Sequence, residues 1–274
     1  MSHLQDRVVV VTGAGSGFGR LLVRGSVARG ARAVALDVDG AGAASTVADL
    51  GDRAIAVRAD VTDAAAMRAA VARTIEAFGA VDVMVNNAGI MPLAFWADHG
   101  RALDAWSRCI DVNIKGVMHG IAAVYDHMTE RGRGHVVNIS SIYGNHAVVG
   151  SAVYTATKAA VNILSDTLRQ EAQGRIKVTV VRPTGVVGTG LGAGVVNRDA
   201  IAGIVGTNAA AFADAATAWA SGTLPAAMAD RDEMAYWTIT PQDLVDQVLY
   251  AIDQPWGITI GDITVRASGE HYQL

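Results

Sequence analysis

Short runs of apolar, mostly branched residues alternate along this chain with longer segments of helical periodicity. The runs are continuously apolar rather than alternating, which suits strands buried on both faces of a parallel sheet. The segments between them are long enough for crossover helices. The pattern therefore predicts a doubly wound α/β fold, with helices on both faces of a parallel seven-stranded sheet. The expected strands are residues 7–13, 32–37, 54–61, 81–89, 135–141, 177–185 and 257–265.

The chain of 274 residues is expected to be a single domain spanning 1–274, because no linker-like segment divides it and only five prolines occur. Residues 186–240 break the regular alternation: a glycine-rich stretch precedes alanine-rich segments of helical character. Insertions at the carboxyl ends of strands often form lids or binding loops. We expect a substrate-binding insertion there, with a surface helical hairpin as the alternative.

Composition limits the partners of this chain. A net charge of −4 offers no basic patch for nucleic acid or an anionic membrane. Cys109 is the only cysteine, so an internal disulfide is impossible and a reducing compartment is favoured. The N-terminus has no signal-peptide pattern, and no run approaches the roughly 20 apolar residues of a membrane span. We expect a cytoplasmic protein with no nucleic-acid or membrane partner.

The stretch "VVVVTGAGSGFGR" places several glycines between the first strand and the first helix. Glycines permit a tight turn and close approach of a pyrophosphate, and the helix N-terminus offers free N–H groups and a positive dipole end. The position between a strand and a helix strengthens the pattern. It predicts a Rossmann-type dinucleotide site, with a glycine turn that binds nothing as the alternative. Its residues are Gly13, Ser16, Gly17, Phe18 and Gly19.

Asp37 ends the second strand, 18 residues beyond Gly19. A carboxylate at about this spacing accepts hydrogen bonds from the adenosine ribose and repels a 2′-phosphate. Val38 and Asp39 follow it, so no adjacent arginine is present to bind that phosphate. NAD is therefore predicted over NADP as the cofactor.

In "VYTATKAAVN" (153–162), Tyr154 and Lys158 lie four residues apart, on one face of a helix. A free phenol has a pKa of about 10, too high for a base near neutrality. A cation one turn away would favour the phenolate and lower that pKa. The pair is either a tuned acid and base or an exposed pair without a role.

Together these motifs resemble the short-chain dehydrogenase/reductase family, from Val8 to about Val187. "TGAGSGFG" looks like the glycine turn of that family, and "YTATK" like its Tyr-x-x-x-Lys motif. "NISSIYG" places Ser141 thirteen residues before Tyr154, as the family pattern requires. Further matching segments are "ADVTD", "NNAG" (86–89) and "DVNIKG".

The resemblance implies an active-site tetrad of Asn113, Ser141, Tyr154 and Lys158. Tyr154 would be the general base in oxidation and the general acid in reduction, and Lys158 would lower its pKa and hold the nicotinamide ribose. Ser141 would hydrogen-bond the substrate oxygen, so substrate contacts are expected at Ser141 and Tyr154. Asn113 would orient a water that links Lys158 to solvent. Ser140 is the nearest rival of Ser141.

The resemblance also implies further cofactor contacts. Asp60 would hold the adenine with Val61 packed beside it, and Val186 would donate a backbone hydrogen bond. The sequence departs from the family pattern after the sixth strand, because Thr184 replaces a glycine and Thr189 is displaced by one residue. The complete expected cofactor set beyond the glycine turn is Asp37, Asp60, Val61, Asn87, Ala88, Gly89, Tyr154, Lys158, Pro183 and Val186.

The predicted activity is NAD-dependent interconversion of a secondary alcohol with a ketone or aldehyde, as in an alcohol dehydrogenase or carbonyl reductase. "IYGNHAVVGSAV" and "LGAGVV" are mostly apolar, and no Arg or Lys occurs in these pocket segments, which favours an uncharged, largely apolar small-molecule substrate. The aromatic residues Trp96, Trp106 and Trp219 are expected to serve packing. Alternatives are an NAD-binding regulator without turnover and a non-redox member of the same fold. We expect no metal site and, from the resemblance, a homodimer or homotetramer.

Overall fold

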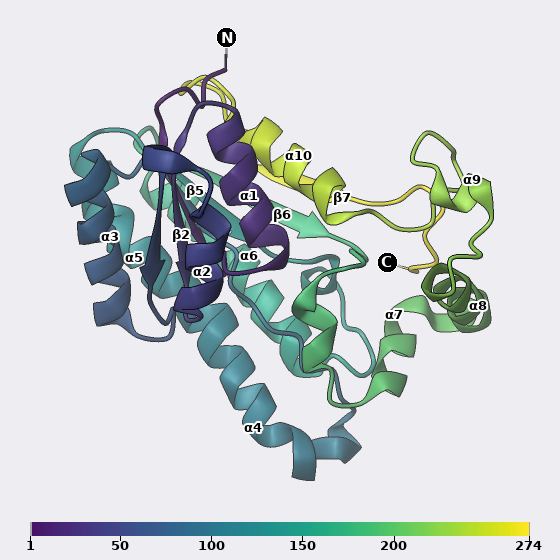
Figure 1. The fold of residues 1–274 in the computed structure, drawn as a ribbon. Helices are drawn as coiled ribbons and strands as arrows, with labels where there is room; N and C mark the ends of the chain where they lie inside the picture. The colour runs from purple at the N-terminus through teal and green to yellow at the C-terminus, as the bar shows by residue number, and fades with distance from the viewer. Residues whose placement is uncertain (1, 274) are drawn as a thin grey trace.

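The computed structural model describes residues 2–273, and its centre is a parallel sheet of seven strands (Figure 1). The spatial order β3-β2-β1-β4-β5-β6-β7 reverses direction between β1 and β4, as in a doubly wound fold. This confirms the predicted fold class. The strands are β1 (Val8–Thr12), β2 (Arg32–Asp37), β3 (Ala54–Arg58), β4 (Val83–Asn86), β5 (His135–Ile139), β6 (Lys177–Pro183) and β7 (Asp262–Val265).

Helices cover both faces of the sheet because the strand side chains alternate between two cores. Val9 and Val11 pack in the core that includes residues of α1 and α10. Val10 packs in the opposite core, with residues of α3, α5 and α6. Within residues 2–273 no helix is both long and apolar enough to cross a membrane. The main helices are α1 (Gly17–Ala28), α2 (Gly40–Val47), α3 (Ala64–Phe78), α4 (His99–Ile110), α5 (Gly116–Glu130), α6 (Ala152–Glu171) and α10 (Pro241–Ile252).

Several strands are shorter than the apolar runs that predicted them. The run 54–61 ends as a strand at Arg58, and the run 81–89 ends at Asn86. The remaining residues of each run form loops at the carboxyl edge of the sheet. Ala59 and Val61 are buried although they lie past the end of β3, so the burial of apolar residues does not mark where a strand ends.

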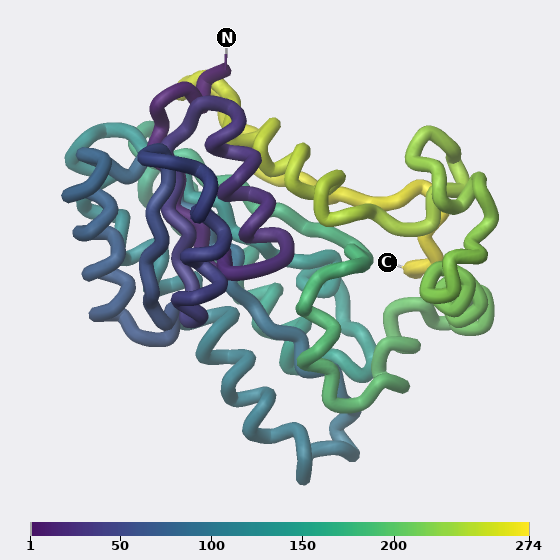
Figure 2. Tube along the Cα trace, in the orientation of Figure 1, coloured from purple at the N-terminus to yellow at the C-terminus, as the bar shows by residue number. Residues whose placement is uncertain are grey.

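Residues 186–240 form a lobe of short helices beside the sheet, drawn in green in Figure 1. It contains α7 (Ala202–Val205), α8 (Ala209–Ala220) and α9 (Ala226–Ala229). The C-terminal segment returns to this lobe, as Figure 2 shows: the Gln273 amide donates to the Ile204 carbonyl at 3.1 Å. The Asn208 side chain donates to the His271 carbonyl at 2.9 Å. The insertion is therefore tied to the chain terminus rather than projecting as a free hairpin.

A chain of buried polar side chains joins two central strands to α6. The Asn86 amide donates to the Asn138 oxygen, and the Asn138 amide donates to the Ser165 hydroxyl, both at 2.8 Å. Ser165 lies on α6, and all three residues are buried. Gly120 of α5 packs against Asn86 so closely that a methyl group there would overlap the Asn86 side-chain oxygen.

Gly120→Ala is therefore expected to lower the free energy of unfolding by about 2 kcal/mol, because the added methyl displaces Asn86 from this chain of hydrogen bonds. Gly100→Ala is the matched control: it lies on α4 with open space around the new methyl group. That control is expected to be neutral or stabilising by up to about 1 kcal/mol. Urea denaturation measures both, and equal midpoints for the two variants would contradict the prediction.

Candidate functional site

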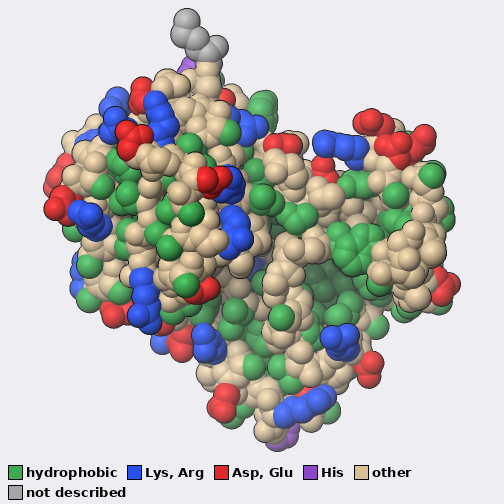
Figure 3. All heavy atoms as spheres, viewed as in Figure 1, with side chains coloured by type: hydrophobic (Ala, Val, Ile, Leu, Met, Phe, Trp, Pro, Cys, Tyr) green, Lys and Arg blue, Asp and Glu red, His purple; other side chains and the backbone are tan. Residues whose placement is uncertain are grey.

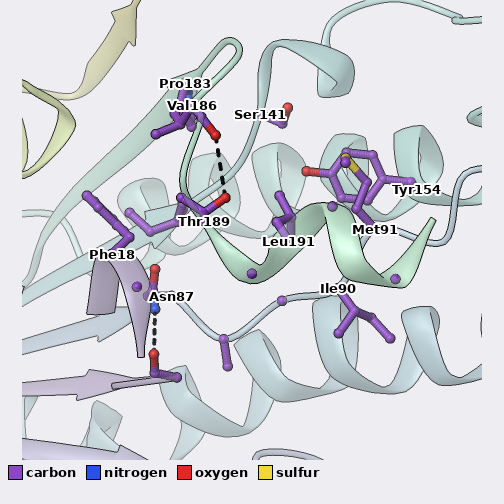
Figure 4. Close-up of a pocket in the computed structure, with 18 of the residues that line it drawn as sticks. Phe18, Asn87, Ile90, Met91, Ser141, Tyr154, Pro183, Val186, Thr189 and Leu191 are labelled. Carbon is purple, nitrogen blue, oxygen red and sulfur yellow. Dashed lines mark hydrogen bonds between the residues drawn. The ribbon is translucent and has the colours of Figure 1, made fainter. Parts of the chain in front are cut away.

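A cavity of about 680 Å³ lies at the carboxyl edge of the sheet, between the sheet body and the insertion lobe. Figure 3 shows the molecular surface hollowed there, with hydrophobic side chains along the hollow. All of the predicted site residues except Asn113 line this cavity. Figure 4 shows Phe18 and Asn87 on one side of the cavity and Tyr154 on the other. The structure thus brings together residues from five separate motifs.

The glycine turn has the backbone geometry that glycine permits. Gly13 and Gly17 adopt φ angles of 66° and 49°, in the left-handed region. A methyl group at Gly19 would overlap the Gly13 carbonyl oxygen. The helix α1 begins at Gly17, and its Ser16 N-cap makes no side-chain capping hydrogen bond. The first turn lines the cavity, so the positive end of the helix dipole is available to an anionic group.

Asp37 stands at the end of β2 beside this turn. One carboxylate oxygen accepts a hydrogen bond from the Gly15 amide at 2.7 Å, and the other accepts one from the Asp39 amide at 2.8 Å. Each oxygen keeps a further acceptor position. The carboxylate is therefore fixed by the backbone while remaining on the cavity wall.

Arg58 is a neighbour of Asp37 that the sequence reasoning missed. The two residues are paired across β2 and β3, although 21 positions separate them along the chain. The Arg58 guanidinium donates to the Val38 carbonyl at 3.2 Å. Arg58 is not among the residues that line the cavity, whereas Val38 is.

Ser141, Tyr154 and Lys158 meet where β5 faces α6. Ser141 follows β5, and its hydroxyl accepts a hydrogen bond from the Tyr143 amide at 3.2 Å. The Lys158 ammonium donates to the Ile139 carbonyl at 2.9 Å and lies 5.7 Å from the centre of the Tyr154 ring. Ser140 also lines the cavity, but its hydroxyl donates to the Lys158 carbonyl at 3.2 Å.

Burial dominates the electrostatics of this cluster. It raises the pKa of Tyr154 above the ordinary value, and the hydrogen bond with the Ser141 hydroxyl counteracts only part of this. Burial also lowers the pKa of Lys158 from about 10.5 to about 8. The sequence analysis expected a lowered pKa for Tyr154, whereas in this structure the pKa is raised. Desolvation of the phenolate outweighs the interactions that would lower it.

Asn113 lies behind the cavity wall rather than on it. It is buried in a π-helical turn, η3 (Asp111–Lys115), between α4 and α5. Its oxygen accepts from the Ile90 amide at 2.9 Å, and its amide donates to the Ile90 carbonyl at 3.0 Å and the Thr157 hydroxyl at 3.1 Å. The Thr157 hydroxyl in turn donates to the Tyr154 carbonyl at 2.7 Å. Asn113 therefore links the loop after β4 to the helical turn that carries Tyr154.

The loop after β6 forms another wall. Pro183, Val186 and Thr189 all line the cavity, so the displaced threonine still reaches it. The Thr189 hydroxyl donates to the Val186 carbonyl at 3.4 Å, the contact drawn in Figure 4. Val186 also forms an isolated parallel bridge with Ile239, which closes the base of the insertion.

Three aromatic residues of the cavity were not predicted as site residues. Tyr143 lies in a segment expected to line the pocket, but nothing marked this residue. Trp219 was expected to serve packing; it is 45% exposed and lines the cavity. Tyr272 comes from the C-terminal segment, and only the tertiary hydrogen bonds of that segment bring it to the site.

Comparison with known proteins extends these observations. Residues 7–199 match the protein family described as short chain dehydrogenase. A 3-alpha-(or 20-beta)-hydroxysteroid dehydrogenase of Mycobacterium tuberculosis is 42% identical over 182 residues, which cover 66% of this chain and 69% of that protein. An uncharacterized oxidoreductase of Staphylococcus saprophyticus is 31% identical over 278 residues, covering 98% of this chain and 99% of the relative.

Solved structures of the same architecture include complexes with a bound dinucleotide. The 3-ketoacyl-(acyl-carrier-protein) reductase of Brucella melitensis, complexed with NADH, superposes with a TM-score of 0.76 at 26% identity, covering 97% of this chain and 99% of that one. The closed form of a serine dehydrogenase complexed with NADP⁺ has a TM-score of 0.76 at 27% identity and 94% coverage of each chain.

Lys158→Met is expected to raise the free energy of unfolding near pH 7. The folded pKa of about 8 lies below the ordinary 10.5, so the charged form is disfavoured in the folded state. Below pH 8 Lys158 is protonated in both the folded and the unfolded protein, so the full cost of burying its charge, up to roughly 3 kcal/mol, is present. The cost disappears as the pH rises towards 10.5. Loss of the hydrogen bond to Ile139 offsets about 1 kcal/mol of the gain.

Urea denaturation at pH 7 and pH 10 measures this effect, and the stabilisation should shrink at the higher pH. Lys115→Met is the matched control, because the Lys115 side chain is 54% exposed on the protein surface. It should change the unfolding free energy by less than about 0.5 kcal/mol at either pH. A Lys158→Met protein less stable than wild type at pH 7 would contradict the assignment of a burial cost to this lysine.

Proposed function

Because this chain belongs to the short-chain dehydrogenase/reductase family, we propose that it is an NAD-dependent oxidoreductase interconverting a secondary alcohol and a ketone. One observation carries the proposal: a single cavity has the glycine turn and Asp37 on its wall together with Tyr154 and Lys158. A dinucleotide site is thereby continuous with an acid–base site. This arrangement suits hydride transfer coupled to proton transfer.

The residues present fit a dinucleotide. Gly13 and Gly19 lie so close to neighbouring backbone that neither position has room for a side chain. The N-terminus of α1, which begins within this turn, suits a pyrophosphate. Asp37 would hold the adenosine ribose, and Lys158 the nicotinamide ribose. Asp60, Val61 and the segment 87–89 complete the cavity wall between them. When bound, the dinucleotide supplies or accepts the hydride and, in its oxidised form, adds a positive charge to the site.

In the proposed mechanism Tyr154 moves the proton at the substrate oxygen. In reduction its hydroxyl, which burial keeps protonated, gives a proton to the ketone oxygen. In oxidation the phenolate takes the proton from the alcohol, and the Lys158 ammonium stabilises that phenolate. The Ser141 hydroxyl donates a hydrogen bond to the substrate oxygen as charge develops on it.

Asn113 acts in this proposal as a positioning residue. Its side chain fixes the Ile90 backbone and, through Thr157, the helical turn of Tyr154. The expected water relay stays a prediction, since the Asn113 oxygen accepts from the Ile90 amide and keeps a further acceptor position. A hydrogen-bonded support of this kind holds the acid–base group at a constant distance from the substrate.

The substrate is proposed to be a neutral, largely apolar alcohol or ketone held partly by the 186–240 insertion. Leu191, Ile201, Ile204 and Trp219 of the insertion line the cavity. The charged residues on the cavity wall are Asp37, Asp60, Arg108 and Lys158, and none of them lies in the insertion. A phosphate ester or other polyanion would therefore find no cation among the insertion residues that line the cavity.

Tyr154→Phe is expected to lower the rate of ketone reduction by roughly 100-fold or more, because the proton donor is removed while the ring remains. NADH binding, measured by fluorescence titration, should persist. Tyr250→Phe, an exposed tyrosine on α10, is the control and should retain full activity. An active Tyr154→Phe enzyme would refute the mechanism. Tight NADH binding without turnover of any ketone would favour the regulator instead.

NADH is expected to bind at least roughly tenfold more tightly than NADPH, because Asp37 would face the 2′-phosphate with a like charge. Asp37→Ser should weaken NADH binding and strengthen NADPH binding. Arg58→Ala, measured in the same titrations, tests the neighbouring cation and should leave the preference for NADH in place. A wild-type preference for NADPH that Arg58→Ala abolishes would show that Arg58, rather than Asp37, sets the specificity.

A further inference from the structure

Tyr143 carries a hydroxyl that the proposed chemistry does not use. It lies two residues after Ser141, is only 9% exposed and lines the cavity. Its ring packs edge-on against Tyr154, with centroids 5.5 Å apart. Its amide donates to Ser141, but among the described residues its hydroxyl has no hydrogen-bond partner. Because Tyr143 lines the cavity and its hydroxyl is not sealed from solvent, a ligand oxygen can replace water as the hydrogen-bond partner of this group.

Tyr272 brings a second hydroxyl of the same kind to the cavity from the C-terminal segment. Its ring lies beside Phe212 of α8, with centroids 6.0 Å apart. The residues on either side, His271 and Gln273, are hydrogen-bonded to the insertion lobe. A methyl group at Gly185 would overlap the Tyr272 hydroxyl, so the glycine leaves space for the phenol to approach the loop after β6. Its hydroxyl likewise makes no hydrogen bond within residues 2–273.

The two phenols are close enough to influence each other. Burial raises the pKa of Tyr143, and Tyr272 and Tyr154 raise it further, so Tyr143 lies within electrostatic reach of both. Burial, with a smaller contribution from Glu270, raises the pKa of Tyr272 to about 12. Both hydroxyls are therefore protonated donors near neutral pH. No cation lowers either pKa, so an anionic ligand group would find no counter-charge there.

We propose that Tyr143 and Tyr272 bind a second, uncharged oxygen of the substrate, separate from the oxygen that reacts at Tyr154. This inference rests on the proposed function and narrows its substrate class. The substrate would be a largely apolar molecule with two oxygen functions, one at the reacting carbon and one hydrogen-bond acceptor elsewhere on the skeleton. Two donors held by separate parts of the fold would fix which of the two oxygens faces Tyr154.

Matched ketones that differ only in the second oxygen test this inference. Suitable pairs are 2-decalone with decalin-2,6-dione, and 5α-androstan-3-one with 5α-androstane-3,17-dione. Each is titrated calorimetrically into the protein saturated with NAD⁺, where no hydride is available to reduce it. Two neutral hydrogen bonds should make the wild type bind at least one dione roughly tenfold more tightly than its monoketone.

Tyr143→Phe and Tyr272→Phe keep the rings and remove the hydroxyls. Each is expected to reduce the dione-to-monoketone ratio by roughly three- to tenfold, and the double variant to bring it close to one. Tyr250→Phe is the control and should keep the wild-type ratio. Equal wild-type binding of both members of every pair, no detectable binding of either dione, or unchanged ratios in the Phe variants would each overturn the inference.

Turnover with NADH separates this result from the test of the proposed function. Ketone reduction that depends on Tyr154 but shows no preference for a dione in binding or in kcat/KM would sink the inference and leave the proposed function standing. Absence of reduction of every ketone would count against the proposed function. The calorimetric ratio would still decide whether the two phenols recognise a second oxygen.

Discussion

The seating of α6 on β5 is the interaction on which the rest of the site depends. Three polar contacts cross this interface: the Lys158 ammonium to the Ile139 carbonyl, the Ser140 hydroxyl to the Lys158 carbonyl and the Asn138 amide to Ser165. An apolar interface tolerates small slides and rotations, whereas buried hydrogen bonds are lost if the partners move by about an ångström. These contacts restrain the position of the helix, and they also restrain Tyr154 relative to Ser141 because both residues are carried by this junction.

The same junction places two unfavourable groups in the interior. Lys158 keeps a cation, and Tyr154 a phenol, where desolvation opposes the charged form of each. Desolvation also makes the two groups sensitive to one another, because a charge acts more strongly in a poorly solvated site. A protein selected for stability alone would place apolar residues at both positions. Their presence together is a physical reason to assign them to chemistry rather than to packing.

The sequence was sufficient for those parts of the molecule that local rules determine. Continuous apolar runs predict buried parallel strands, and a glycine turn between strand and helix predicts the backbone at Gly13 and Gly17. The exact strand ends could not be read, because buried apolar residues such as Ala59 and Val61 continue past them. Arg58 and Asn113 show the limit more sharply. Strand pairing brings Arg58 to Asp37, and tertiary hydrogen bonds turn Asn113 away from the cavity, so neither position follows from the order of residues.

The two ends of the cavity are formed by different parts of the chain. The end with the glycine turn, Asp37 and Ser141 lies within residues 7–199, the part that matches the family. Ile204, Trp219 and Tyr272 also line the cavity but lie beyond that part. The C-terminal segment and the insertion hold each other through contacts such as Gln273 to Ile204 and the Trp237 indole to His271 at 3.1 Å. Substitutions there can reshape that end of the cavity without moving the α6–β5 junction. Under the proposed function, the same acid–base pair could then serve different substrates.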